Sequence, residues 1–146
     1  MFIVCTISHT QVLSVKDLTI DHKKDPVGIE VLQPRFSWKI EGPVRNIMQT
    51  AYSIRVATDE KFSSAKIIWQ SGKVQSDQSI LVPYNGPELK SGQRYYWQVK
   101  ITDNKKNESK WSEPAFWEME YMVLNFPILF QTGQKILHCL QTENRL

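Results

Sequence analysis

Acidic side chains are the residues of this sequence that could do acid–base chemistry, provided that two of them meet in one cleft. A general acid and a general base must both reach the same reacting group. Here the carboxylates are dispersed over loops and the ends of expected strands: Asp17, Asp21, Asp25, Asp59, Glu60, Asp77, Glu118 and Glu120. Because no motif brings two of them together, we predict turn caps and loop charges, and no catalytic residue.

Asp77 has the most motif-like surroundings of these carboxylates. It lies in Ser76-Asp77-Gln78-Ser79, just ahead of an expected strand. Short polar side chains at such positions accept hydrogen bonds from backbone amides of the turn. We therefore predict that Asp77 caps turn amides.

The histidines and cysteines lack the spacing of a metal site. His9, His22 and His138 are far apart, and Cys5 and Cys139 lie near opposite ends of the chain. Structural zinc sites draw their ligands from closely spaced pairs, and the two cysteines do not describe a disulfide framework. We predict no metal and no cofactor.

The composition is that of one globular domain. The chain has 146 residues, of which 41% are hydrophobic and 23% charged, with a net charge of +3. This length provides one real core but not two large ones. Acidic and basic residues are mixed without a basic block, which argues against a nucleic-acid partner. No segment approaches the roughly 20 apolar residues that cross a bilayer, so we expect no membrane partner. Residues 1–6 are apolar but lack the positive charge of a secretion signal, so we predict no signal peptide there.

The elements that position the side chains show the two-residue alternation of half-buried strands. The clearest runs predict strands over residues 35–40, 51–57 and 95–102. Their inward residues are expected to be Phe36, Trp38, Ile40, Tyr52, Ile54, Val56, Tyr95, Trp97, Val99 and Ile101. The alternate residues of the longest run, Tyr96, Gln98, Lys100 and Thr102, are expected to face water. Shorter β-branched and aromatic runs predict strands over residues 18–20, 67–70, 79–82 and 115–119.

Turn residues separate these runs and interrupt any helical period before Met119. Glycine, proline and asparagine cluster between them, as in Tyr84-Asn85-Gly86-Pro87. About seven short strands at this spacing predict an all-β fold, an antiparallel β-sandwich of immunoglobulin-like or fibronectin type III-like class. A closed barrel is the alternative architecture.

Residues 89–95 carry a local motif of such sandwiches. Leu89 lies six positions ahead of Tyr95, with Gly92 between them. This spacing is typical of a tyrosine corner, in which the phenol hydroxyl bonds to upstream backbone at a Greek-key crossing. We predict this bond for Tyr95.

Aromatic residues suggest a binding function of a different class, because flat rings can stack on the apolar faces of sugar rings. Among the five tryptophans, Trp38 and Trp97 fall on inward faces and are expected to pack in the core. Tyr84 is a further candidate surface aromatic. The candidate carbohydrate-binding residues are Trp69, Trp111 and Tyr96. A contiguous exposed row of these rings would favour sugar binding, whereas buried or scattered rings would disfavour it.

A series of short stretches resembles the N-terminal fibronectin-like β-sandwich of bacterial α-L-rhamnosidases. These stretches, in order, are Asp25-Pro26-Val27-Gly28-Ile29, Pro34-Arg35-Phe36-Ser37-Trp38, Gln49-Thr50-Ala51-Tyr52, Trp69-Gln70-Ser71-Gly72-Lys73-Val74, Ser76-Asp77-Gln78-Ser79, Tyr95-Tyr96-Trp97-Gln98-Val99 and Trp111-Ser112-Glu113. The resemblance covers residues 18–119 and implies an accessory module of a glycoside hydrolase. It also implies that the catalytic carboxylates belong to an (α/α)₆ barrel outside this chain, and that the domain is a spacer or stabiliser whose partners are the following domains of the parent enzyme. Rhamnose-containing glycans are the alternative partners, and by family analogy the protein would be periplasmic or extracellular.

The sequence departs from that resemblance after Met119. The family would continue into a second β-domain, whereas residues 120–146 read as an apolar and then polar tail. We therefore expect an N-terminal extension over 1–14, the sandwich over 15–119 and an atypical tail over 120–146. A truncated or frameshifted reading frame would leave this tail poorly packed or disordered, and a short C-terminal helix covering the sandwich is the alternative.

Overall fold

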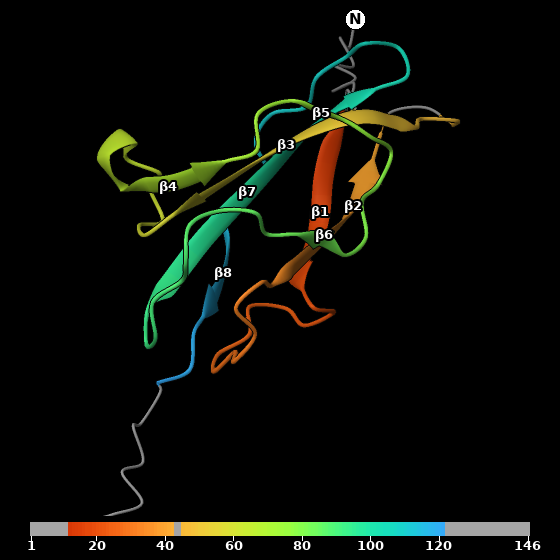
Figure 1. The fold of residues 1–146 in the computed structure, drawn as a ribbon. Helices are drawn as coiled ribbons and strands as arrows, with labels where there is room; N and C mark the ends of the chain where they lie inside the picture. The colour runs from red at the N-terminus through yellow and green to blue at the C-terminus, as the bar shows by residue number, and fades with distance from the viewer. Residues whose placement is uncertain (1–11, 43–44, 122–146) are drawn as a thin grey trace, which may run out of the picture.

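The computed structural model describes residues 12–42 and 45–121, which form two antiparallel sheets packed against each other (Figure 1). The strands are β1 (Ser14–Ile20), β2 (Arg35–Glu41), β3 (Gln49–Ala57), β4 (Ile67–Gln70), β5 (Val74–Gln75), β6 (Val82–Pro83), β7 (Arg94–Asp103) and β8 (Ala115–Glu118), with one 3₁₀ helix, η1 (Ser64–Lys66). The predicted all-β, immunoglobulin-like sandwich is confirmed. The expected tail lies outside the described residues, apart from Glu120 and Tyr121.

The smaller sheet has the order β1-β2-β6. Its register shifts between Lys16 and Thr19, where Asp17 adopts a positive φ of 51°. An extra residue in one strand of an antiparallel pair makes a bulge that bends the strand. The bulge lets both Val15 and Leu18 point inward, although the two are three positions apart.

The larger sheet has the order β4-β3-β7-β8, and β5 also pairs with β3. β3 and β7 are its centre, with Ile54 opposite Val99 and Val56 opposite Trp97. All four of these side chains are at most 1% exposed, as the alternation predicts. On the far side of β7, Tyr95 pairs with Trp117 of β8.

Aromatic rings fill the space between the two sheets. Phe36 of the smaller sheet lies 4.6 Å from Trp97 and 5.8 Å from Trp117, both of the larger sheet, measured between ring centroids. Trp38 and Trp97 are core residues, as predicted. Each fully buried ring of this kind stabilises the fold by roughly 1.5–3 kcal/mol.

Tyr84 is also a core residue, so the prediction of a surface position was wrong. It lies two residues after Val82 and therefore points to the same inward side, and its amide donates to the carbonyl of Pro34 at 3.0 Å. Its hydroxyl donates to the carbonyl of Pro87 at 2.9 Å. Burial, together with the neighbouring Tyr95, raises the pKa of Tyr84 to about 12.

The expected strand over residues 79–82 is shorter and lies later than predicted. Leu81 has a positive φ of 54°, which is incompatible with extended backbone, and β6 begins only at Val82. Before this break the carbonyl of Ser79 still accepts a hydrogen bond from the amide of Trp38 at 2.9 Å. The segment therefore follows β2 on both sides of a kink.

The tyrosine corner is present. The hydroxyl of Tyr95 accepts a hydrogen bond from the backbone amide of Lys90 at 2.7 Å, and Leu89 is buried beneath the turn. Gly92, between them, has a φ of 67°, a conformation that glycine adopts without steric cost. This bond fixes the connection into β7.

Gln49 joins the two sheets by polar contacts that the sequence pattern did not reveal. Its carbonyl oxygen accepts from the Trp38 indole at 2.9 Å, and its amide nitrogen donates to the carbonyls of Ser76 at 3.1 Å and Gln78 at 2.9 Å. Gln49 is 4% exposed. Satisfying these buried groups removes the penalty that an unpaired buried amide would carry.

Asp103 closes the turn that follows β7. Its carboxylate is 2% exposed and accepts hydrogen bonds from the amides of Lys105 and Asn107, both at 2.8 Å, and from the Asn107 side chain at 3.0 Å. Burial alone would raise the pKa of this carboxyl, but the hydrogen bonds from Asn107 and Lys105 outweigh it and hold the pKa below its ordinary value. The charged form is therefore the one that the fold requires.

Asp103→Ala is expected to lower the free energy of unfolding by about 1–3 kcal/mol at neutral pH, because two turn amides lose their acceptor. Since the folded-state pKa is depressed, this contribution is fully present above the unfolded-state pKa of about 4 and is lost as the pH falls through the folded-state value. The difference between wild type and variant should therefore shrink in acid. Urea unfolding at neutral pH and at about pH 3 measures it.

Asp77→Ala is the matched control, because Asp77 is exposed. It should change stability by no more than about 0.5 kcal/mol. A loss for Asp103→Ala as small as that of the control, or one that does not depend on pH, would contradict the structural role of the carboxylate.

Candidate functional site

The outer face of the larger sheet is covered in part by a polar and aromatic cluster. Arg55 of β3 lies opposite Gln98 of β7, and its guanidinium donates two hydrogen bonds to the Gln98 carbonyl oxygen, at 3.0 and 2.6 Å. The Gln98 amide nitrogen donates in turn to the carbonyl of Ser112 at 2.7 Å. Gln98 is consequently 8% exposed. The prediction that it faces water was wrong, because the loop after β7 folds back over it.

Trp111 lies in this returning loop and packs on the same cluster. The carbon at the centre of the Arg55 guanidinium is 4.3 Å from the Trp111 ring centroid and 4.7 Å from that of Phe62. The ammonium of Lys100 lies 5.5 Å from the Trp111 ring. A cation held over an aromatic face is attracted by the ring quadrupole. The half-buried Trp111 thus already has cationic neighbours within the domain.

The three candidate carbohydrate-binding rings do not lie on one surface. Tyr96 is on the outer face of β7, where its ring lies 6.2 Å from that of Phe116. Trp69 of β4 pairs with the inward-facing Val56 and packs inside the sandwich, 5.1 Å from the Tyr84 ring. The larger sheet therefore separates Trp69 from Tyr96 and Trp111, which share its outer side.

Several of the dispersed carboxylates have structural partners. Asp21 pairs with Arg35 at 2.7 Å, Asp17 with Lys39 at 2.9 Å and Glu118 with Arg94 at 3.0 Å. The hydrogen bond and the charge of Lys39 hold the pKa of Asp17 below its usual value. A general acid needs a raised pKa, so the surroundings of Asp17 suit a permanently charged group.

Asp25 and Asp77 are the carboxylates that lie in the short sequence motifs. Asp25 accepts a hydrogen bond from the amide of Phe116 at 3.0 Å and so ties the loop after β1 to β8. The turn amide of Gln78 is capped by the hydroxyl of Ser76 at 3.0 Å. The predicted cap from Asp77 was therefore wrong, because the serine one position earlier already occupies that amide.

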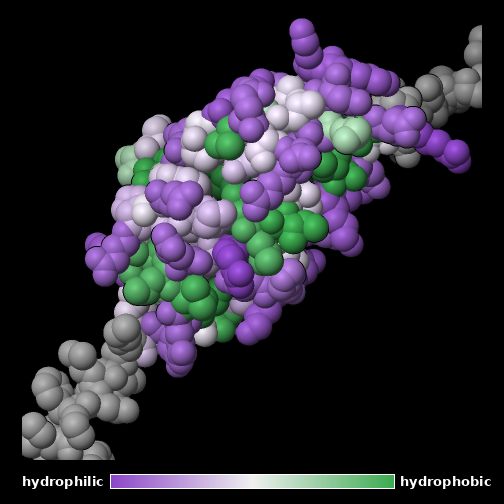
Figure 2. Space-filling view, turned by 45° about the vertical axis from the view of Figure 1, so that its right-hand side comes forward, coloured by the Kyte–Doolittle hydropathy of each residue, from purple (hydrophilic) through white to green (hydrophobic). Residues whose placement is uncertain are grey.

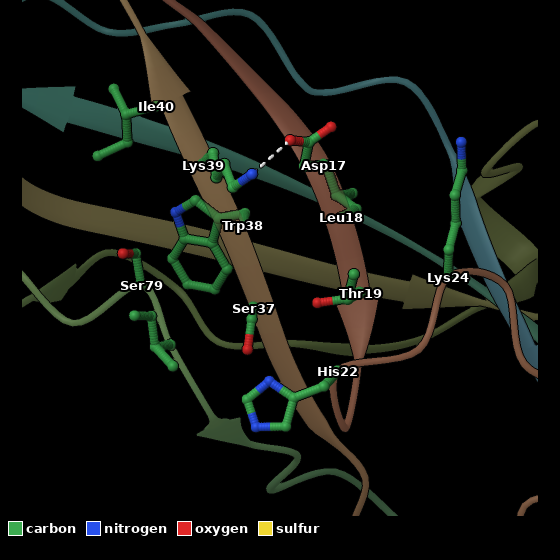
Figure 3. A pocket seen from close by; sticks show the side chains of 11 residues that line it. Asp17, Leu18, Thr19, His22, Lys24, Ser37, Trp38, Lys39, Ile40 and Ser79 are labelled. Atoms are coloured by element: carbon green, nitrogen blue, oxygen red, sulfur yellow. Dashed lines mark hydrogen bonds and ion pairs between the residues drawn. The ribbon is translucent and has the colours of Figure 1, made fainter.

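A shallow hollow lies on the outer side of the smaller sheet and was not anticipated from the sequence (Figure 3). Its volume is about 760 Å³, and residues of β1 and β2 line it together with His22 and Ile80. Half of its polar side chains already have partners: the Asp17 carboxylate binds Lys39, the Ser37 hydroxyl accepts from the amide of Leu81 at 2.9 Å, and the Trp38 indole donates to Gln49. Thr19, His22, Lys24 and Ser79 contribute the remaining polar side chains of the lining.

A larger groove lies at the end of the molecule where the described chain finishes. Its volume is about 1190 Å³, and its lining comes from three separate segments: Ile29, Glu30, Leu32, Pro87, Glu88, Leu89, Lys90, Ser91, Met119, Glu120 and Tyr121. Leu32 and Tyr121 are 57% and 71% exposed. No sequence motif indicates this groove, because its parts meet only through the fold.

Residues 12–42 and 45–121 contain neither a metal-binding cluster nor a membrane-spanning helix. No group of three or more histidine, cysteine, aspartate or glutamate side chains is placed to hold a metal ion there. Within the same ranges no helix has the length and apolar character needed to span a bilayer.

Comparison with known proteins assigns the family. A family model described as the Rha78A-like, N-terminal immunoglobulin domain matches residues 15–123. The chain belongs to this family. An α-L-rhamnosidase from Streptomyces avermitilis is 39% identical over 110 residues, which cover 75% of this chain and 11% of that enzyme. An α-L-rhamnosidase from Formosa agariphila is 39% identical over 109 residues, which cover 73% of this chain and 11% of the relative.

The solved structures agree with this assignment. The crystal structure of the Streptomyces avermitilis α-L-rhamnosidase with L-rhamnose superposes with a TM-score of 0.71 at 38% identity, covering 75% of this chain and 11% of that one. The chain thus spans about 11% of the length of these two curated relatives. It corresponds to their N-terminal immunoglobulin domain, and their catalytic domain is not covered.

Gln98→Leu tests the outer cluster. The substitution keeps the side-chain volume but leaves the Arg55 guanidinium and the Ser112 carbonyl without their partner, so we expect a loss of about 1–3 kcal/mol in the free energy of unfolding. Gln75→Leu, the same exchange at an exposed position of β5, is the matched control and should change stability by no more than about 0.5 kcal/mol. Equal urea midpoints for the two variants would show that the cluster does not stabilise the fold.

Proposed function

We propose that this domain is a non-catalytic accessory module of an α-L-rhamnosidase-type glycoside hydrolase, which stabilises and positions the domains that follow it. The observation that carries the proposal is the match of residues 15–123 to the N-terminal immunoglobulin domain of such enzymes. The arrangement of the carboxylates supports it. Inverting glycosidases hold two carboxyl groups about 6.5–9.5 Å apart across the sugar, whereas Asp17, Asp21 and Glu118 each form an ion pair with a neighbouring cation.

A stabilising role follows from the physical chemistry of domain association. A domain that binds only the folded form of its neighbour raises the neighbour's stability, by about 2.7 kcal/mol when it is present at a hundred times the dissociation constant. Interfaces between domains of one chain resemble transient protein–protein interfaces. The module would therefore act through a surface and needs no cleft of its own.

The experiment uses the full chain together with the Streptomyces avermitilis enzyme from which the matched N-terminal segment has been removed. The chain alone should show no turnover of a chromogenic α-L-rhamnoside above the buffer rate. Added in excess to the trimmed enzyme, it should lengthen the half-life of rhamnosidase activity at elevated temperature. Turnover by the chain alone would contradict the non-catalytic role, and an unchanged half-life would contradict the stabilising role.

Carbohydrate binding by surface aromatics is the second proposal. It is favoured by one observation, the position of Trp111 and Tyr96 on the same outer face of the larger sheet. The inward position of Trp69 and the cations beside Trp111 weigh against it. The accessory role is therefore the function that we place first.

Titration of the chain with a rhamnose-containing oligosaccharide separates the two proposals. If the domain is only a stabiliser, tryptophan fluorescence should not change in a saturable way. Saturable binding that is lost in Trp111→Ala and kept in Trp111→Phe would instead identify a sugar-binding face. Trp111→Phe is the control because it retains a flat ring at this position.

A further inference from the structure

Four of the seven large hydrophobic side chains that are more than half exposed in the described residues lie at one end of the domain. The large hydrophobic residues that are more than half exposed include Val27, Val31, Leu32 and Tyr121, all in the loop after β1 or at the last described position. Figure 2 shows several hydrophobic patches on the visible face, one of them at the lower left of the molecule, and the ribbon places the loop after β1 near the end of β8 (Figure 1). Contiguous apolar surface with a polar rim marks an interaction site.

The chain leaves this end in a fixed direction. After β8, the loop holds the chain from one side: the amide of Ile29 donates to the carbonyl of Glu118 at 2.9 Å, and the amide of Glu120 donates to the carbonyl of Ile29 at 3.0 Å. From the other side, the amide of Met119 donates to the carbonyl of Gln93 at 3.0 Å, and the amide of Gly92 donates to the carbonyl of Glu120 at 3.2 Å. These bonds make residues 118–120 an extension of the sandwich rather than a free linker.

Tyr121 extends this fixed exit into the groove wall. Its ring packs so closely over Gly92 that a Cβ atom at that position would lie 2.4 Å from the ring. Most of the ring nevertheless remains exposed, at 71% for the residue. The last described residue of the chain therefore lies at the mouth of the groove.

We propose that the domain that follows the module in an α-L-rhamnosidase chain packs in this groove. Leu32 and Tyr121 would be the main apolar contacts that the groove provides. The inference rests on the proposed function and names the surface through which that function acts. In the relatives the matched segment is the N-terminal domain and only 11% of the enzyme, so the next domain begins next to this exit. Covalent linkage through a short connection gives such a neighbour an effective concentration in the millimolar range.

The rim of the groove specifies the chemistry of the partner face. Glu30, Glu88 and Glu120 are exposed around it, with Lys90 as the cation among them. An acidic rim is complementary to basic side chains, and charge complementarity at a rim sets orientation and depends on salt. The surface of the next domain that contacts the groove should therefore be apolar at its centre and basic at its edge.

Nuclear magnetic resonance of the isotope-labelled full chain tests the inference, because it detects binding as weak as millimolar. The probe is the Streptomyces avermitilis enzyme that lacks its matched N-terminal segment. Addition of this large partner should reduce the signal intensity of residues 29–32, 87–91 and 119–121 before that of the rest, and added salt should weaken the effect. Leu32→Asp should weaken binding at least about tenfold.

Ile80→Asp is the matched control, because Ile80 is exposed to a similar extent (61%) but lies at the hollow on the smaller sheet. It should bind the trimmed enzyme like the wild type. Binding that affects another face, or that Leu32→Asp leaves unchanged, would overturn the groove assignment and leave the accessory function standing. Concentration-dependent changes at the groove without partner would assign it to a second copy of the chain. Absence of any binding would overturn both the inference and the proposed function.

Discussion

The contact between Phe36 and the rings of the larger sheet is the interaction on which the domain depends. Phe36 belongs to the smaller sheet, and its ring packs against Trp97 and Trp117 of β7 and β8. The two sheets of a sandwich are held face to face by interdigitating side chains, of which these rings are among the largest. The bulge at Asp17, the kink at Leu81 and the inward position of Tyr84 all shape the chain around this aromatic centre.

The aromatic core also limits where polar side chains can be placed in the domain. Gln49 between the sheets and Asp103 in the turn after β7 are buried together with their hydrogen-bond partners. The buried indole nitrogens of Trp97 and Trp117, by contrast, have no hydrogen-bond partner. On the outer face, Arg55 and Gln98 satisfy each other beneath Trp111. The polar chemistry of the domain is thus largely used for its own stability. This is the physical basis for assigning it a structural role beside a catalytic domain.

The exit of the chain links this fold to that role. Residues 118–120 are hydrogen-bonded on both sides, so the direction in which the chain continues is set by the sandwich. A neighbour attached to such an exit is held in a narrower range of orientations than one on a flexible linker. The apolar groove at the same end provides a surface against which that neighbour can pack.

The sequence by itself determined the three long strands β2, β3 and β7 and their inward faces, because a period of two is a local property that needs no knowledge of the partner strand. It also determined the tyrosine corner, since Leu89, Gly92 and Tyr95 lie within one turn. Only the tertiary structure decided that Gln98 is covered and that Trp69 and Trp111 lie on opposite sides of one sheet. It alone formed the groove, because the covering loop and the three groove segments approach one another through long-range packing that no local pattern encodes.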